Sequence, residues 1–162
     1  MANWVKTRIT FPLATNEEFN EIVEKYCVKD EHTENKVLDF EKIIPIPNDI
    51  YRGNIGPKEQ ELYGENTWYW WCVKHWGTKW NAFEGHVKPD DKSITFNTAW
   101  AFAKNVVAKL AELTHQEIEA MYADENLGNN TGRFVFFSDG TVSGEPFVDD
   151  SDEAWDVVHE LY

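Results

Sequence analysis

Several kinds of residue are scarce in this chain of 162 residues, and each scarcity excludes a class of protein. The two cysteines, Cys27 and Cys72, are too few for a disulfide framework, so we expect free thiols in a reducing compartment. No apolar run approaches the roughly 18 residues that a membrane span needs. Residues 1–11 lack the basic region, apolar core and cleavage site of a secretory signal. We therefore expect a cytoplasmic protein.

Positive charge is also scarce, because 15 Lys and Arg residues stand against 29 Asp and Glu, giving a net charge of −14. This excess opposes the phosphate contacts that dominate nucleic-acid affinity, and it favours basic protein partners. From Phe134 to Tyr162 there are eight acidic residues and no Lys or Arg. Such a charge run is most often a solvated surface. The sharper alternative is an acidic face that binds a basic protein through Asp149, Asp150, Asp152, Glu153, Asp156 and Glu160.

Aromatic residues, by contrast, are abundant, and five of the eight tryptophans lie between Asn66 and Trp80. Gly77 stands where a left-handed residue would end a helix. Rings of this size must pack on an apolar surface, for which a sheet is the expected partner. The residues at the spacing of one helix face are Trp68, Trp71, Cys72 and Trp76. Three aromatic residues off the predicted apolar stripes are candidates for an exposed ligand-binding patch: Tyr69, Trp70 and Trp100.

Alternating and helical periodicities divide the rest of the chain into strands and helices. Segment 48–64 shows no period and is predicted to be a long ordered loop. A strand at 80–87 is expected to turn Trp80 and Ala82 toward the core. Further strands are predicted at 4–11, 37–44, 93–100, 117–123, 133–138 and 141–142, and helices at 16–27, 68–76 and 102–113.

A last helix is predicted after a capping box of Asp150 and Glu153. Its expected apolar residues are Trp155, Val158, His159 and Tyr162. The order of all these elements predicts an α+β fold, in which helices cover a mixed or antiparallel sheet.

Four short motifs and a stretch rich in acids and glycine support a closer comparison. They are segments 3–5, 40–45, 71–81 and 96–100, together with Tyr122, Asp124, Glu125, Gly128 and Gly132. In these residues the chain resembles the YubB-type ferredoxin-like domain family, whose members occur largely on plasmids and in phages and have no assigned molecular function. The resemblance implies a ferredoxin-like core at about 3–140. The chain length predicts one domain over 1–162, in which an acidic helix at about 150–162 follows this core. Residues 101–103 lack the prolines usual in the family, so the following helix is expected to begin early.

Cys72 and His75 have the spacing of half a metal site, which His86 would extend. The same pair could form a Cys-His nucleophile if the two side chains met in a cleft. Because both lie on the predicted tryptophan helix, packing is the favoured explanation.

Two further groups also have a simpler structural explanation. Glu117, Glu119, Asp124 and Glu125 could supply an acid and a base, but solvated carboxylates are favoured. Phe134 and Phe136 are similar to the aromatic strand of RNA-recognition domains, yet core packing is the default.

We expect a non-enzymatic module from a phage or plasmid that binds a protein with a basic surface. An inhibitor of a host nucleic-acid-binding or defence protein would fit this description. The alternative is a binder of a small molecule or single-stranded nucleic acid that uses exposed aromatic residues. We expect no cofactor and no metal, and the sequence leaves the oligomeric state open.

Overall fold

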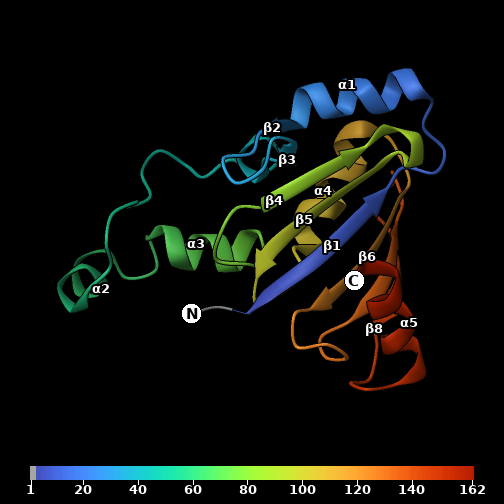
Figure 1. Ribbon diagram of the computed structural model, residues 1–162. Helices are drawn as coiled ribbons and strands as arrows, with labels where there is room; N and C mark the ends of the chain where they lie inside the picture. Colours follow the sequence, from blue (N-terminus) through green and yellow to red (C-terminus); the bar gives the residue numbers. More distant parts are fainter. Residues whose placement is uncertain (1–2) are drawn as a thin grey trace.

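The computed structural model of the protein describes residues 3–162 and confirms the predicted α+β architecture (Figure 1). The main sheet is antiparallel, and its strands lie in the order β4 (Phe83–Lys88), β5 (Ser93–Ala99), β1 (Trp4–Thr10), β6 (Ile118–Asp124), β7 (Gly132–Phe136) and β8 (Val142–Pro146). The helices α1 (Asn16–Tyr26) and α4 (Lys104–Thr114) join these strands into two interleaved β-α-β units, which is the ferredoxin-like arrangement. The β7-β8 hairpin extends the sheet beyond β6.

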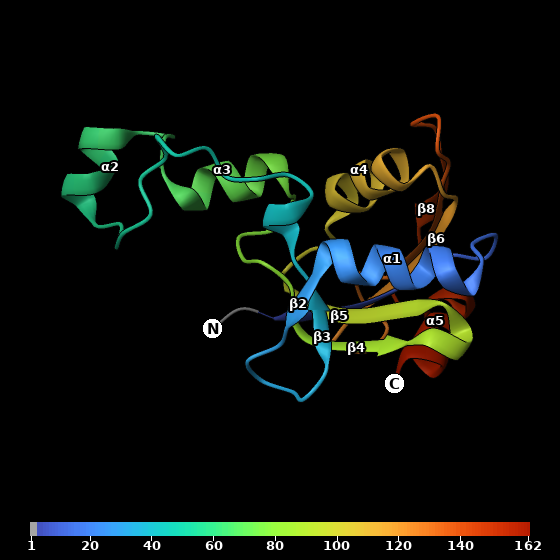
Figure 2. The same ribbon diagram turned by 90° about the horizontal axis from the view of Figure 1, so that it is seen from above.

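One face of the sheet is covered by α1 and α4, and the main core lies between these layers (Figure 2). β1 alternates as predicted, because Val5 and Ile9 are fully buried while Arg8 faces the other side. α1 begins with the predicted capping box, in which Thr15 Oγ1 accepts a hydrogen bond from the Glu18 amide and Glu18 Oε1 accepts one from the Thr15 amide.

The opposite face is covered in part by α5 (Asp152–Leu161), where a smaller apolar cluster forms. The predicted capping box is wrong, because Ser151 Oγ caps the helix and Asp150 precedes it with a positive φ of 60°. The predicted apolar face is also largely wrong. Trp155 turns toward Gly128 in the β6-β7 loop, so the buried residues of α5 are Ala154, Val157, Val158 and Leu161.

Between α1 and β4 the chain makes a long excursion. β2 (Cys27–Lys29) and β3 (Lys36–Leu38) form a short ribbon beside β4, followed by a 3-10 turn, η1 (Phe40–Lys42). Residues 45–75, which we call the arm, then project from the side of the sheet (Figures 1 and 2). The arm contains α2 (Pro57–Tyr63) and the tryptophan helix α3 (Trp68–His75), and Gly77 has the expected positive φ.

The structure corrects four predictions for residues 37–104. The strand expected at 37–44 ends at Leu38, because the Asp39 carboxylate accepts a hydrogen bond from the Glu41 amide and starts η1. The loop expected at 48–64 contains α2, which buries none of its residues and therefore shows no apolar period. Trp80 precedes β4 and is half-exposed rather than in the core, and α4 begins at Lys104 rather than early.

The hairpin between β4 and β5 is closed by a second 3-10 turn, η2 (Pro89–Asp91). No helix within residues 3–162 has the length and apolar character needed to cross a membrane.

Candidate functional site

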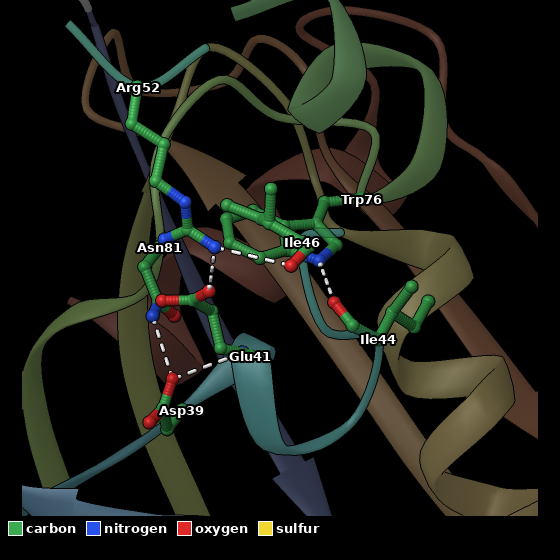
Figure 3. Close-up of polar contacts among 7 residues, drawn as sticks. All are labelled: Asp39, Glu41, Ile44, Ile46, Arg52, Trp76 and Asn81. Atoms are coloured by element: carbon green, nitrogen blue, oxygen red, sulfur yellow. Dashed lines mark hydrogen bonds and ion pairs between the residues drawn. The ribbon is translucent and has the colours of Figure 1, made fainter. Parts of the chain in front are cut away.

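A set of polar contacts ties the arm to the rest of the molecule (Figure 3). The indole Nε1 of Trp76 donates to the carbonyl of Ile44 at 2.8 Å, which joins the two ends of the arm. Arg52 pairs with Glu41 at 3.1 Å and donates to the carbonyl of Ile46 at 3.2 Å. These contacts therefore fix the two ends of the arm to each other and to η1.

Asn81 joins the segment after the arm to the segment before it (Figure 3). Its Oδ1 accepts hydrogen bonds from the amides of Phe40 and Ala82, at 2.9 and 2.8 Å. Its Nδ2 donates to the Asp39 carboxylate at 2.8 Å. The motif segments 40–45 and 71–81, far apart in sequence, thus lie against each other.

The outer side of α3 borders a half-open pocket of about 420 Å³, which we call the arm pocket. Trp70, 48% exposed, is the most open aromatic residue in its wall. The apolar wall consists of Ile50, Trp70, Trp71 and Val73, and the polar rim of Glu65, Asn66, Lys74 and His75. A pocket with this volume and these indole walls suits an apolar or planar group of a ligand or partner.

The three aromatic residues proposed as ligand contacts do not form one site. Tyr69 is half-buried, packs edge-on against Trp68 and Trp70, and does not line the arm pocket. Trp100 follows the end of β5 and lies in a separate cluster with Trp80. Trp70 is therefore the only one of the three in the wall of the arm pocket.

The second aromatic cluster, which we call the indole clamp, consists of Trp80, Trp100 and the lysine between them. The ammonium of Lys79 lies 4.2 Å from the ring centroid of Trp80 and 4.0 Å from that of Trp100. Both indoles are about half exposed, at 40% and 45%. Sequence periodicity missed this arrangement because it depends on two segments that meet only in the fold.

The acidic face predicted on the C-terminal region is exposed, but two of its six residues have partners. Asp149 accepts a hydrogen bond from the Asn130 amide at 3.2 Å, and Glu160 pairs with Arg133 at 2.9 Å. The other carboxylates form no ion pair with any residue the structure describes; they belong to Asp150, Asp152, Glu153 and Asp156.

Cys72, His75 and His86 do not share a site. Cys72 is buried, and burial raises the pKa of its thiol to about 12, so it is protonated and a weak nucleophile at neutral pH. His75 stacks on Trp71 at the rim of the arm pocket, while His86 on β4 bonds to the side chain of Asn35. Within residues 3–162, no three His, Cys, Asp or Glu side chains are grouped to hold a metal ion.

The remaining candidates have structural surroundings. Asp124 is buried rather than solvated, and its carboxylate accepts hydrogen bonds from the side chain of Asn3 and the amide of Asn126. Glu125 is exposed and accepts a hydrogen bond from the amide of Trp4. Phe134 and Phe136 are buried, and both pack near Phe102 on the α4 side of the sheet, as the default explanation predicted. Glu119 is exposed and Glu117 half-exposed.

Comparison with known proteins gives a family but no activity. The family model described as "Ferredoxin-like domain in Api92-like protein" matches residues 75–162, just over half of the chain. A crystal structure of the protein Api92 from Yersinia pseudotuberculosis is similar at 15% sequence identity, with a TM-score of 0.49. The similar region covers 68% of this chain and 39% of that protein. No curated protein matches the chain.

Proposed function

The chain belongs to the family of the ferredoxin-like domain in Api92-like proteins. Because the ferredoxin-like fold hosts many unrelated functions, we propose the function of this chain from its own surface. We propose that it is a non-enzymatic module that binds another protein. The contact surface is the outer side of the arm, and the acidic face contributes to the choice of partner.

The exposed apolar side chains of the arm carry this proposal. Leu62 on α2 is 67% exposed, and Trp70 and Val73 on α3 stand beside the arm pocket. Exposed apolar groups that gather around a pocket are a common feature of protein interfaces, in which aromatic anchors supply much of the binding energy. The projection of the arm from the sheet makes these side chains accessible to a large partner (Figure 1).

Charge supports a basic partner. The carboxylates of Asp150, Asp152, Glu153 and Asp156 lie on one region at the start of α5 and are exposed. With a net charge of −14, the molecule attracts positively charged proteins and repels nucleic acids. Charge of this kind mainly speeds association, and its effect falls as salt screens it.

Affinity capture with matched variants tests the proposal. The immobilised protein is mixed with a lysate of the cells that naturally make it, at low and high salt, and retained proteins are identified. Trp70→Ser with Val73→Ser is expected to abolish retention of the partner, whereas Leu13→Ser, which alters a 71% exposed residue outside the arm, is expected to preserve it. Asp152→Asn with Asp156→Asn is expected to weaken retention mainly at low salt.

The same partner retained equally by wild type and the arm double variant would contradict the role of the arm. Retention of no basic protein by the wild type at either salt would contradict the module as a whole. A purified partner then allows the dissociation constants of all four proteins to be compared by calorimetry.

We also propose the finer origin and target. The motifs shared with the YubB-type family support a phage or plasmid source, and a compact acidic protein from such a source fits an inhibitor of a host nucleic-acid-binding or defence protein. The neighbouring genes test this: genes of plasmid transfer, phage or anti-defence function are expected beside it. A setting among ordinary chromosomal metabolic genes would count against it.

A second function is favoured by the arm pocket itself, because its volume of about 420 Å³ lies within the range of small-ligand sites. In this alternative, the exposed indole of Trp70 stacks on a small molecule or on a base of single-stranded nucleic acid. Titration with nucleotides, oligonucleotides and sugars would then quench tryptophan fluorescence saturably, and Trp70→Ser would remove the response. Linear or absent quenching with all three classes would exclude it.

A further inference from the structure

Lys79 has an unusual position among the lysines that contact aromatic rings. Within residues 3–162, Lys6, Lys25 and Lys104 each lie over one ring, whereas Lys79 lies between two. Its ammonium forms no ion pair with a carboxylate in the described part of the chain. The two half-exposed indoles are therefore its main partners, through the attraction between a cation and the faces of the rings.

The backbone segments that carry the two indoles are anchored by hydrogen bonds. The buried hydroxyl of Thr78 donates to the carbonyl of Ala99 at 2.7 Å, which fastens segment 78–80 to the end of β5. The amide of Trp100 donates to the carbonyl of Asn3 at 2.8 Å, and the side chain of Asn130 donates to the carbonyl of Trp100 at 2.9 Å. The backbone that carries Trp80 and Trp100 is therefore fixed by contacts that do not involve the side chain of Lys79.

Trp100 also has a positive φ of 68°, a conformation that is rare for a bulky side chain and stores strain. This conformation turns the chain directly after β5 and leaves the indole half exposed instead of placing it in the core. Strain of this kind persists where the surrounding structure enforces it, and it is concentrated at functional sites.

One acidic residue, Asp149, is linked through Asn130 to the backbone of Trp100. Asn130 bonds to the carbonyl of Trp100 through its side chain and to the carboxylate of Asp149 through its amide, so a single residue connects the clamp to the acidic face. The faces of the two indoles attract a cationic group, and the net charge of −14 disfavours an anionic one.

We propose that the indole clamp is a binding site for an alkylammonium group, the side chain of a lysine on a basic partner protein. Lys79 occupies the site in the free protein and is displaced when the partner's lysine enters. The identity of the occupant rests on the proposed function, because a binding partner must exist to supply the lysine. The affinity of the clamp for a cation does not rest on it.

The affinity for a cation is tested with tetramethylammonium chloride as the probe and neopentyl alcohol, a neutral molecule of similar shape with one added hydroxyl, as its control. The indole N–H resonances of the eight tryptophans are followed by nitrogen-proton NMR, and those of Trp80 and Trp100 are assigned with Trp→Phe variants. In Lys79→Ala, tetramethylammonium is expected to shift these two resonances saturably, and the alcohol is expected not to. Wild type is expected to need about tenfold more cation, because Lys79 competes.

Lys79→Met is the matched control, since it keeps an apolar stem in the clamp without the charge, and it is expected to respond less than Lys79→Ala. Thermal unfolding of each variant checks that the fold is kept. Equal responses to the charged and neutral probes, or no saturable shift in a folded Lys79→Ala, would overturn the proposal.

A captured partner separates this proposal from the proposed function. Lys79→Ala is expected to bind that partner about tenfold more tightly and Trp100→Leu more weakly. Cation binding at the clamp with no captured partner would support the clamp as a cation site and contradict the protein-binding function. A captured partner whose affinity is the same for wild type, Lys79→Ala and Trp100→Leu would support the protein-binding function and contradict the clamp as a site for the partner's lysine.

Discussion

Asn81 is the residue on which the junction between the arm and the sheet most depends. It accepts two backbone hydrogen bonds, from Phe40 and Ala82, and donates one to Asp39. An aspartate of the same length could accept the two backbone hydrogen bonds, but it would lack the donor for Asp39, so the site needs the amide of asparagine. Its side chain therefore supplies the hydrogen bonds that strand pairing would otherwise supply between the segments before and after the arm.

Asn81→Ala is expected to lower the free energy of unfolding by about 2 kcal/mol, because the partly buried Phe40 amide loses its acceptor. Urea unfolding followed by tryptophan fluorescence measures the change. Asn48→Ala, which alters an exposed asparagine in the arm, is the control and is expected to change stability by less than about 0.5 kcal/mol. Equal effects of the two substitutions would show that the contacts of Asn81 are not stabilising.

The two cysteines should make stability depend on alkaline pH. Burial raises the pKa of the thiols of Cys27 and Cys72 to about 12, whereas an unfolded thiol titrates near about 8.5. Above the unfolded value, the unfolded chain has lost protons that the folded chain retains. Stability therefore falls as pH rises, by up to about 1.4 kcal/mol per pH unit for each thiol.

Urea midpoints measured from neutral pH to about pH 10 test this expectation. Wild type is expected to lose stability above about pH 8.5, and the double variant Cys27→Ala, Cys72→Ala, although less stable throughout, is expected to show a shallower decline. The same thiols should resist alkylation in the folded protein and react in urea. Rapid alkylation of folded Cys72 would instead indicate a reactive cysteine.

At the scale of elements, α2 differs from every helix that packs on the sheet. It has seven residues and buries none of them, while α4 buries Val106, Val107, Leu110 and Ala111. A helix this short is marginal without tertiary packing. Its main fixed contact is the stacking of Tyr63 on Tyr51, with ring centroids 4.4 Å apart.

Hydrogen exchange should reveal this difference. The amides of α2 are expected to exchange orders of magnitude faster than those of α4, because α2 can open locally without disturbing the core. Mass spectrometry of peptic fragments over seconds to hours measures both. Protection of α2 comparable to that of α4 would mean that α2 is covered in solution, for example by a bound partner.

The same contrast explains which elements could be predicted from the sequence. β1 and α1 were predictable because each presents one apolar face to the core, which imposes a period on the residues. α2 has no buried face and so shows no period. The strand expected at 37–44 was wrong because the apolar run there can also form a turn, and the Asp39 carboxylate that selects the turn acts only through local geometry.

The candidate site was predictable only in part. The exposure of Trp70 and Trp100 followed from their positions off the apolar stripes, although their role in binding stays a prediction. Trp80 was misplaced because the alternation of β4 was extended back beyond Phe83, where the strand begins. The clamp around Lys79 brings residues 79–80 next to Trp100. The spacing of residues along the chain does not predict this contact between two distant segments.

At the scale of the molecule, the sheet separates two apolar clusters of unequal size. The larger one, beneath α1 and α4, includes most of the buried residues, and the smaller one joins α5 to Ala123, Met121 and Phe147. Polar contacts at the edge of α5 add to its packing, since Arg8 donates to the carbonyl of Glu160 at 2.8 Å. α5 therefore packs on the second face of the sheet, while the main core lies on the first face.

Ending the chain after Val148 removes this cover. The burial of Val157, Val158 and Leu161 contributes roughly 1.5–3 kcal/mol each, so the loss is about 5–9 kcal/mol from a total that is typically about 5–15 kcal/mol. A truncated chain that folds should have a much lower urea midpoint, and it should self-associate in sedimentation because Met121 and Ala123 become exposed. Val157→Ala keeps the chain length and is expected to cost about 1–3 kcal/mol, against less than about 0.5 kcal/mol for the exposed control Asp156→Ala. If Val157→Ala and Asp156→Ala unfold at the same urea concentration, α5 is not packed on the sheet in solution, and the acidic face it carries has no fixed position from which to select a partner.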